Sequence, residues 1–290
     1  MTVSEDIAPP STHDGPISVV LDRARFARFA DLVTDTLGIK MPAAKVTLLE
    51  NRLRGRMRQL GMTSLDAYEA YLFRSAHSND ELVHFCDVVT TNKTDFFREP
   101  QHFEFLREHA LPSLASERPG GELRIWCAGC SSGQEAYTLA MVASEFAEQY
   151  GRRFSILATD ISTRMLAQAR RAVYPENIVD PIPLELRKKY LLRSKDRRQA
   201  LVRIRPELRR AVAFERLNFM DRDYRRRGSY DAIFFRNVMI YFDKATQAAV
   251  VNRLAQSLTP GGYLFIGLSE SLVGARVPLT TVGPAILRKT

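Results

Sequence analysis

The sequence predicts an α/β protein in which a parallel, doubly wound sheet follows a helical segment. Three observations support this prediction. From about residue 120 onward, short apolar runs alternate with helix-length segments, which indicates right-handed βαβ crossovers. Residues 17–90 show helical periodicity and no convincing strand alternation. The chain has 290 residues, 45% of them hydrophobic and 26% charged, as expected for a globular protein with one large or two smaller domains.

The stretch 45–60 shows the periodicity of the helical segment most clearly. Apolar residues recur there at spacings of three and four and should face a core: Val46, Leu49, Leu53, Met57 and Leu60. Basic residues flank this stripe, with Lys45, Arg52 and Arg56 on one side and Arg54 and Arg58 on the other. Two interpretations remain open, a solvated helix face and a docking surface for an acidic protein.

The second part of the chain alternates strands and helices. We expect strands at 123–128, 154–159, 212–217, 232–235 and 263–267, and helices at 136–146, 162–172 and 244–257. One connection is too long, because about 40 residues separate the helix ending near Ala172 from the strand at Val212. Residues 190–193 and 201–205 alternate like strands, so this connection should hold an inserted antiparallel subdomain at about 175–211.

Charge narrows the classes of partner. The formal net charge is +9, and residues 164–227 carry 19 basic and 8 acidic side chains. Such an excess favours nucleic acid, anionic lipid or an acidic protein. No run of about 18 apolar residues exists, and Met1–Pro16 is polar, so we expect a disordered tail at 1–16, no membrane insertion and no secretion.

Cysteine usage points to a reducing compartment. An odd count of three cysteines over 290 residues does not resemble a disulfide framework, so we expect a cytoplasmic protein. Cys127 and Cys130 form a C-x-x-C spacing that could serve zinc or redox chemistry. No second cysteine pair accompanies it, and small residues in a tight turn are the simpler interpretation, so no metal site is predicted.

The first strand leads into a run of small residues, Ala-Gly-Cys-Ser-Ser-Gly-Gln-Glu at 128–135, which opens a helix. In a doubly wound sheet, ligands bind at the carboxyl ends of the strands near the point where strand order reverses. Gly129 and Gly133 should let the backbone approach a ligand, and the helix N-terminus adds a positive dipole. The run is not G-x-G-x-x-G, so a dinucleotide is disfavoured.

Polar residues follow the later strands. Asp160 ends the second strand, where a carboxylate can accept both hydroxyl protons of a ribose; a helix cap before Ser162 is the alternative. Asn218 lies where an adenine edge would be recognised, and Arg236 and Asn237 end the fourth strand. Residues 258–264, Leu-Thr-Pro-Gly-Gly-Tyr-Leu, are typical of class I S-adenosylmethionine methyltransferases. Four such features in order predict that cofactor.

Three strings carry a more specific resemblance: Thr-Asn-Lys-Thr-Asp-Phe-Phe-Arg-Glu at 91–99, Gly-Gln-Glu-Ala-Tyr at 133–137, and Phe-Phe-Arg-Asn-Val-Met-Ile-Tyr-Phe-Asp at 234–243. From about residue 20 onward the chain resembles the bacterial chemotaxis receptor methyltransferases (CheR). The resemblance implies a helical N-terminal domain at 17–90, a linker with cofactor contacts at 91–110, and a Rossmann-like class I methyltransferase domain at 111–290 with the inserted subdomain.

The resemblance also implies site residues. The cofactor would be lined by Asn92, Thr94, Arg98, Glu135, Asp160, Asn218, Phe219, Arg236 and Asn237. Arg98 and Tyr241 would face the reacting group and hold the incoming carboxylate. The alternatives are a surface ion pair with Asp95 or Glu99 for Arg98, and a core aromatic role for Tyr241.

The implied reaction is methyl transfer from S-adenosylmethionine to receptor glutamates, giving γ-glutamyl methyl esters in chemotactic adaptation. A glutamate of pKa about 4.3 is ionised at neutral pH, so no general base is required. The partners would be the acidic cytoplasmic bundles of methyl-accepting receptors. We expect a cytoplasmic monomer, recruited to membrane receptor arrays, that does not bind nucleic acid.

Two departures from the family pattern stand out. Gln134 and Ala136 replace an acidic residue and a proline beside Glu135. Residues 194–200, where some members bind a receptor's C-terminal pentapeptide, contain no glycine, which disfavours tethering through that peptide.

The sequence also bears on two other functions. Methylation of nucleic acid or of a small molecule gains some support from the basic segment, but the D/N-P-P-F/Y string of many amino methyltransferases is absent. A catalytically silent binding module would not need to keep both Arg98 and Tyr241.

Overall fold

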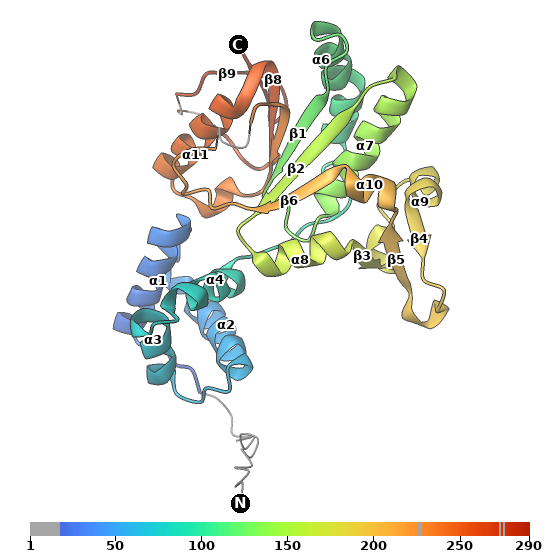
Figure 1. The fold of residues 1–290 in the computed structure, drawn as a ribbon. Coiled ribbons are helices and arrows are strands. Elements are labelled where there is room, and N and C mark those ends of the chain that lie inside the picture. The colour runs from blue at the N-terminus through green and yellow to red at the C-terminus, as the bar shows by residue number, and fades with distance from the viewer. Residues whose placement is uncertain (1–17, 225–227, 273, 275) are drawn as a thin grey trace, which may run out of the picture. The chain divides into compact units, whose positions relative to one another are not determined.

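The structure, a computed structural model, describes residues 18–224, 228–272, 274 and 276–290 (Figure 1). The chain divides into two compact units, one of Met1–Asp31 with Met41–Val89 and one of Leu32–Lys40 with Thr90–Thr290. The tail expected at 1–16 lies outside the described residues. Among the described helices, none combines the length and the apolar character needed to cross a membrane.

The smaller unit is helical, as predicted. Its helices are α1 (Arg23–Leu37, whose last turns count with the larger unit), α2 (Val46–Gln59), α3 (Leu65–Arg74) and α4 (Ser78–Val89). Leu49, Leu53 and Met57 of the predicted stripe are buried, while Val46 and Leu60 at its two ends are partly covered. Burial of one face of α2 therefore follows the periodicity of its sequence.

Arg56 does not lie on an open docking face. Its Nε and Nη2 donate to the two carboxylate oxygens of Glu81 at 3.0 and 2.6 Å, and the Tyr68 hydroxyl donates to the same carboxylate at 2.8 Å. The Glu81 side chain is fully buried. The neighbouring Arg52 donates to the carbonyl of Val89. The docking interpretation is therefore wrong for Arg56, whose charge is neutralised inside the helical unit.

The larger unit contains a seven-stranded sheet with the order β6-β2-β1-β7-β8-β10-β9. The first five of these are parallel and confirm the five predicted strands: β6 (Val212–Arg216), β2 (Phe154–Asp160), β1 (Leu123–Ala128), β7 (Tyr230–Phe235) and β8 (Leu258–Ile266). The hairpin of β9 (Leu279–Gly283) and β10 (Ile286–Lys289) was not predicted; β10 pairs antiparallel with β8, and β9 pairs antiparallel with β10. Strand order reverses between β1 and β7.

Side chains of the central strands alternate between two buried apolar clusters, so helices cover both faces of the sheet. In β1, Ile125 and Cys127 join one cluster with α7, and Trp126 and Ala128 join the other with α11. The remaining helical elements of this unit are α5 (Gln101–Phe105), the π-helical η2 (Leu106–Ala110), α6 (Leu111–Glu117), α7 (Gln134–Tyr150), α8 (Thr163–Arg171), α9 (Leu184–Tyr190), α10 (Pro206–Arg210) and α11 (Lys244–Ser257).

The long connection forms its own antiparallel sheet, as predicted. Its strand order is β3-β5-β4, with β3 (Val173–Pro175), β5 (Leu201–Ile204) and β4 (Leu191–Arg193). The sheet therefore begins two residues before the predicted start of the insertion.

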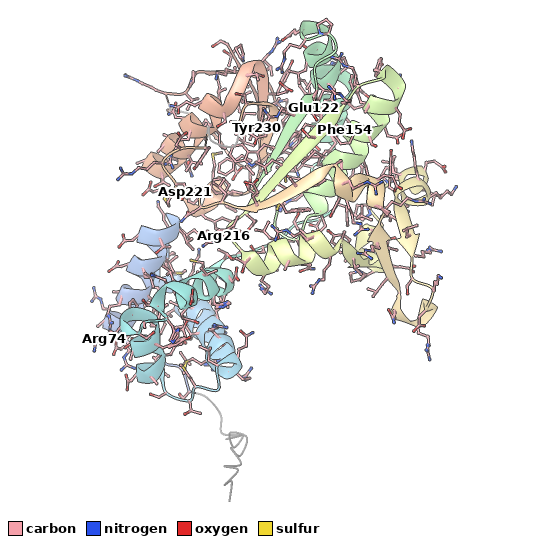
Figure 2. The ribbon with its side chains drawn as sticks, in the orientation of Figure 1. Arg74, Glu122, Phe154, Arg216, Asp221 and Tyr230 are labelled. Atoms are coloured by element: carbon pink, nitrogen blue, oxygen red, sulfur yellow. The ribbon has the colours of Figure 1, made fainter. Side chains whose placement is uncertain are left out.

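The parallel strands all end at one edge of the sheet. Figure 2 labels three residues at one end of the sheet: Glu122, which precedes β1, and Phe154 and Tyr230, where β2 and β7 begin. It labels Arg216, the last residue of β6, at the opposite end. Residues that follow β1, β2, β6 and β7 in sequence are thereby brought together at the carboxyl edge, beside the reversal of strand order.

Candidate functional site

A cavity of about 320 Å³ opens at the carboxyl ends of β1, β2 and β7. Every site residue predicted from the sequence lines it: Asn92, Thr94, Arg98, Glu135, Asp160, Asn218, Phe219, Arg236, Asn237 and Tyr241. These residues come from segments up to about 150 positions apart, so the fold brings together what the sequence motifs keep separate.

The turn after β1 and the end of β2 are locked together by backbone hydrogen bonds. The N–H of Gly129 donates to the carbonyl of Thr159 at 2.8 Å, and the N–H of Ser131 donates to Asp160 Oδ2 at 2.8 Å. Asp160 Oδ1 accepts the N–H of Ser162 at 2.9 Å. Ser162 itself caps α8, because its hydroxyl accepts the Met165 N–H. Asp160 is therefore not the cap; it braces the turn and lines the cavity.

The two glycines of this turn serve different purposes. Gly129 has φ +95° and lines the cavity, and a Cβ there would lie 2.7 Å from Val238 Cγ2. Gly133 has φ +97° and does not line the cavity; a Cβ there would lie 2.9 Å from both the Ala169 Cβ and the Tyr174 hydroxyl. The expectation that Gly133 admits a ligand is wrong, because its bare backbone instead allows close packing against α8 and β3.

Arg236 holds three segments together from a fully buried position. Its Nε donates to Glu135 Oε2 at 2.8 Å, its Nη2 donates to the carbonyl of Arg98 at 2.6 Å, and its Nη1 lies 3.1 Å from His102 Nδ1. The guanidinium also stacks 5.0 Å from the centre of the Phe103 ring. Arg236 thus lines the cavity while its nitrogens bind protein groups, which fixes the backbone of Arg98.

His102 is a site residue that the sequence did not indicate. Its side chain is fully buried, and its Nε2 lies 3.3 Å from the carbonyl of Pro284. A carbonyl can only accept and a guanidinium can only donate, so Nε2 carries the proton and Nδ1 accepts from Arg236. Burial, followed by the charge of Arg236, lowers the pKa of His102 below its usual value, which keeps this neutral tautomer.

Asn237 lies two residues after the end of β7 and has a left-handed conformation, with φ 58°. Its backbone N–H donates to Glu270 Oε2 at 3.0 Å, and its Nδ2 donates to Glu99 Oε1 at 3.2 Å. Burial raises the pKa of Glu270, although backbone N–H donors such as that of Gly267, at 2.7 Å, oppose the shift. Glu99 and Glu270 were not predicted, yet they fix the backbone beside Arg236.

Hydrogen bonds connect the loop 90–99 to the turn after β1 and to α7. The Ser131 hydroxyl donates to the carbonyl of Asn92 at 2.9 Å, and the Phe97 N–H donates to Thr138 Oγ1 at 3.2 Å. Phe97, Glu99 and Ser131 all have positive φ, like Asn237. Such strained backbone is maintained only where the surroundings impose it, and it tends to cluster at functional sites.

Arg98 and Tyr241 lie at the same cavity. Arg98 is half-buried, its Nη1 donates to the carbonyl of Lys93 at 3.3 Å, and no carboxylate of a described residue lies within 4.0 Å of its guanidinium. The surface ion pair with Asp95 or Glu99 is therefore wrong. Tyr241 is half-buried, and it both packs against the α11-side cluster and lines the cavity.

The side chains after β6 are also partnered. Asn218 Nδ2 donates to the carbonyl of Thr36 at 2.7 Å, and its Oδ1 accepts the Met220 N–H at 2.9 Å. The Phe219 ring packs edge-on against Phe235, with centroids 4.9 Å apart. Asn218 thus shapes the chain at the cavity wall, and its recognition of adenine stays a prediction.

The C-x-x-C cysteines lie beneath the turn as buried thiols. Burial raises the pKa of both Cys127 and Cys130, and the Cys127 thiol donates to Glu135 Oε1 at 3.4 Å. Over the described residues, no group of three or more His, Cys, Asp or Glu side chains could hold a metal ion. Cys127 therefore adds a hydrogen bond to the carboxylate that Arg236 binds.

Comparison with known proteins gives consistent matches over both units. Residues 24–90 match the CheR methyltransferase all-alpha domain, and residues 92–284 match the CheR methyltransferase SAM (S-adenosylmethionine) binding domain. A chemotaxis protein methyltransferase of Borreliella burgdorferi is 36% identical, over 94% of this chain and 96% of that protein. One of Escherichia coli is 37% identical over 87% and 86%, and chemotaxis protein methyltransferase 2 of Pseudomonas aeruginosa is 36% identical over 91% and 92%.

Together, the cavity at the carboxyl edge of β1, β2 and β7 and the extent of these matches establish that the chain belongs to the CheR methyltransferase family and is an S-adenosylmethionine-dependent methyltransferase.

Proposed function

We propose that this chain transfers the methyl group of S-adenosylmethionine to glutamate side chains of chemoreceptor cytoplasmic domains, forming γ-glutamyl methyl esters. The observation that carries the proposal is the Arg98 guanidinium, which lines the cofactor cavity with no described carboxylate within 4.0 Å. A guanidinium that lines a cavity with no carboxylate beside it can bind the carboxylate of an incoming substrate. The names of the relatives, chemotaxis protein methyltransferases, support the choice of acceptor.

The cavity residues fit an adenosyl cofactor. A volume of about 320 Å³ lies within the range of small-molecule sites. The Asp160 carboxylate can accept ribose hydroxyl protons, Gly129 exposes bare backbone at the turn, and Phe219 offers an apolar wall to a base. When bound, S-adenosylmethionine supplies an activated methyl group on a sulfonium.

On the acceptor side, Arg98 and Tyr241 would hold the glutamate carboxylate and aim one oxygen at the methyl carbon. A glutamate of pKa about 4.3 arrives ionised, so no side chain has to remove a proton. His102 cannot take that part, because both of its ring nitrogens are occupied by Arg236 and Pro284. Positioning and exclusion of water from the carboxylate would supply the rate enhancement.

The partner in this proposal is the acidic helical bundle of a membrane receptor, to which a cytoplasmic monomer is recruited at receptor arrays. The insertion carries no glycine at residues 194–200, and its turn includes Ala200 with φ 47°. We therefore favour direct contact with the bundle over tethering to a receptor's C-terminal peptide.

Radiolabelled S-adenosylmethionine and a purified receptor cytoplasmic fragment test the proposal. We expect label on the receptor that mild alkali releases as methanol, because carboxyl methyl esters hydrolyse readily, and S-adenosylhomocysteine should block its incorporation. Label that survives alkali would contradict ester formation and point to an amine or a carbon acceptor.

A further inference from the structure

A second cavity, of about 430 Å³, lies at the start of β6 and shares no lining residue with the first. Its walls come from α7, α8, α10 and β6. Three arginines line it, Arg170, Arg209 and Arg210, and no acidic residue does. Such a lining makes the cavity locally positive, and this positive charge has no part in the reaction proposed at the first cavity.

These arginines are poorly compensated. The Nε of Arg209 is buried and has no hydrogen-bond partner in the part of the chain that the structure describes. Arg170 donates to the carbonyl of Phe214 at 2.5 Å. For Arg210 the nearest described carboxylate is that of Glu207, 4.0 Å away, and both side chains are mostly exposed. Such an exposed pair contributes little, so three like charges line one cavity with only this weak ion pair to offset them.

Basic residues of α9 in the same segment are paired. Lys189 contacts Glu145 and Glu148 at 2.7 and 2.6 Å, and Arg187 contacts Asp180 at 3.1 Å. The basic excess of residues 164–227 is therefore neutralised around α9 and left open around α10. An anion at the second cavity would relieve the repulsion there.

The apolar walls of this cavity are already formed. Tyr137 is buried, its hydroxyl donates to the carbonyl of Ala169 at 2.9 Å, and its ring packs edge-on against Phe214 with centroids 5.8 Å apart. Val212 is buried beside them. A ligand entering a preformed site loses less free energy to ordering of the protein.

We propose that this second cavity binds the phosphate group of a small phosphorylated molecule, held by Arg170, Arg209 and Arg210. Planar guanidinium groups bind phosphate oxygens through paired hydrogen bonds, and three of them match the several oxygens of a phosphate better than the two of a carboxylate. The volume leaves space for more than the phosphate itself. This inference is independent of the proposed methyl acceptor.

Calorimetric titration of the full chain tests the site, with S-adenosylhomocysteine present at saturation to fill the first cavity. The probes are inorganic phosphate and uridine 5′-monophosphate, with uridine as the control that lacks phosphate. We expect the two phosphate compounds to bind and uridine not to bind. Absence of binding by both phosphate probes at millimolar concentration would overturn the proposal, as would uridine binding equal to that of its monophosphate.

Two variants place the binding at the arginines. Arg209→Met and Arg210→Met should each weaken binding of uridine 5′-monophosphate about tenfold or more, the scale of one lost charge-assisted hydrogen bond. Arg205→Met is the matched control, because Arg205 is exposed at the start of α10 and does not line the cavity. Equal affinities for the Arg209→Met and Arg205→Met proteins would refute the assignment.

Discussion

Asp160 accepts the backbone N–H groups of Ser131 and Ser162 and also lines the cofactor cavity. We predict that Asp160→Ala weakens S-adenosylmethionine binding by about 1–3 kcal/mol, the scale of lost hydrogen bonds to a charged group. Ser162→Ala removes only the cap of α8, so it should lower stability by about 1 kcal/mol and leave cofactor affinity unchanged. Calorimetry measures both affinities, and an unchanged affinity in Asp160→Ala would refute the ribose role.

The sequence predicts that Arg98 contacts both the cofactor and the acceptor carboxylate, and kinetics can distinguish these two roles. If it orients the acceptor carboxylate, Arg98→Ala should lower kcat about tenfold or more while the S-adenosylmethionine Kd stays nearly constant. Arg107→Ala is the control, since Arg107 is exposed and pairs only with its neighbour Glu108 among the described side chains. A variant with normal kcat and weakened cofactor binding would contradict the acceptor role.

His102 supplies the acceptor for Arg236 Nη1, so an apolar replacement should leave a buried guanidinium nitrogen without a partner. We predict that His102→Leu lowers the free energy of unfolding by about 1–3 kcal/mol, and that His102→Gln, whose amide can both accept and donate, loses less. His109→Leu, at an exposed position of the same helical run, should have little effect. Denaturant titration checks all three, and equal losses at His102 and His109 would contradict the network.

The same histidine predicts a pH dependence. The pKa of His102 is lowered in the folded protein, so below about pH 6.5 the unfolded chain binds a proton that the folded chain does not. Its contribution to stability is therefore complete above about pH 6.5 and is lost as pH falls. The free energy of unfolding should decline less on acidification in His102→Gln, and identical pH profiles for the two proteins would contradict this.

At the scale of elements, α2 is tied to α4 by the buried pair of Arg56 and Glu81. Arg56→Met should lower the free energy of unfolding by about 3 kcal/mol, because it leaves the Glu81 carboxylate buried without its partner. Arg58→Met, on the exposed side of the same helix, should change it by no more than about 0.5 kcal/mol. Equal stabilities of the two variants would contradict a stabilising role for this buried ion pair.

The elements that sequence patterns predicted well are those with strong local signals. α11 was predicted at its observed bounds, Lys244–Ser257, and β1 at Leu123–Ala128. The hairpin of β9 and β10 was not predicted because it joins the sheet through pairing of β10 with β8, a partner that no local pattern reveals. The helical run 101–117 was likewise not predicted; it begins within the linker expected at 91–110 and continues beyond it.

The site divides in the same way. The motifs after β1, β2, β6 and β7 supplied predicted cavity residues because the topology concentrates ligand contacts at these strand ends, whereas Asn92, Thr94 and Arg98 came from the 91–99 string through the family resemblance. The buried network of His102, Arg236, Glu135 and Glu99 could not be read from those motifs. The network forms only when segments more than 100 positions apart meet inside the fold, where the buried charged groups contact one another.

For the molecule as a whole, the basic residues behind the net charge of +9 fall into two groups. Part of the basic excess is balanced by ion pairs around α9, as for Lys189, and part is left open at Arg170, Arg209 and Arg210. The proposed acceptor carboxylate, by contrast, would be held by Arg98 at a cavity that Lys93 and Arg236 also line. The charges that line each cavity therefore bear on function, whereas the overall net charge does not.

The central claim is that one cavity brings a cofactor methyl group to a receptor glutamate held by Arg98. Peptide mapping by mass spectrometry, applied to a receptor cytoplasmic fragment incubated with S-adenosylmethionine and either wild-type protein or Arg98→Ala, tests it most directly. We predict methylated glutamate side chains with the wild-type protein and strongly reduced methylation with the variant. Methylation of receptor lysines or cysteines in place of glutamates, or no methylation of the receptor, would contradict this function.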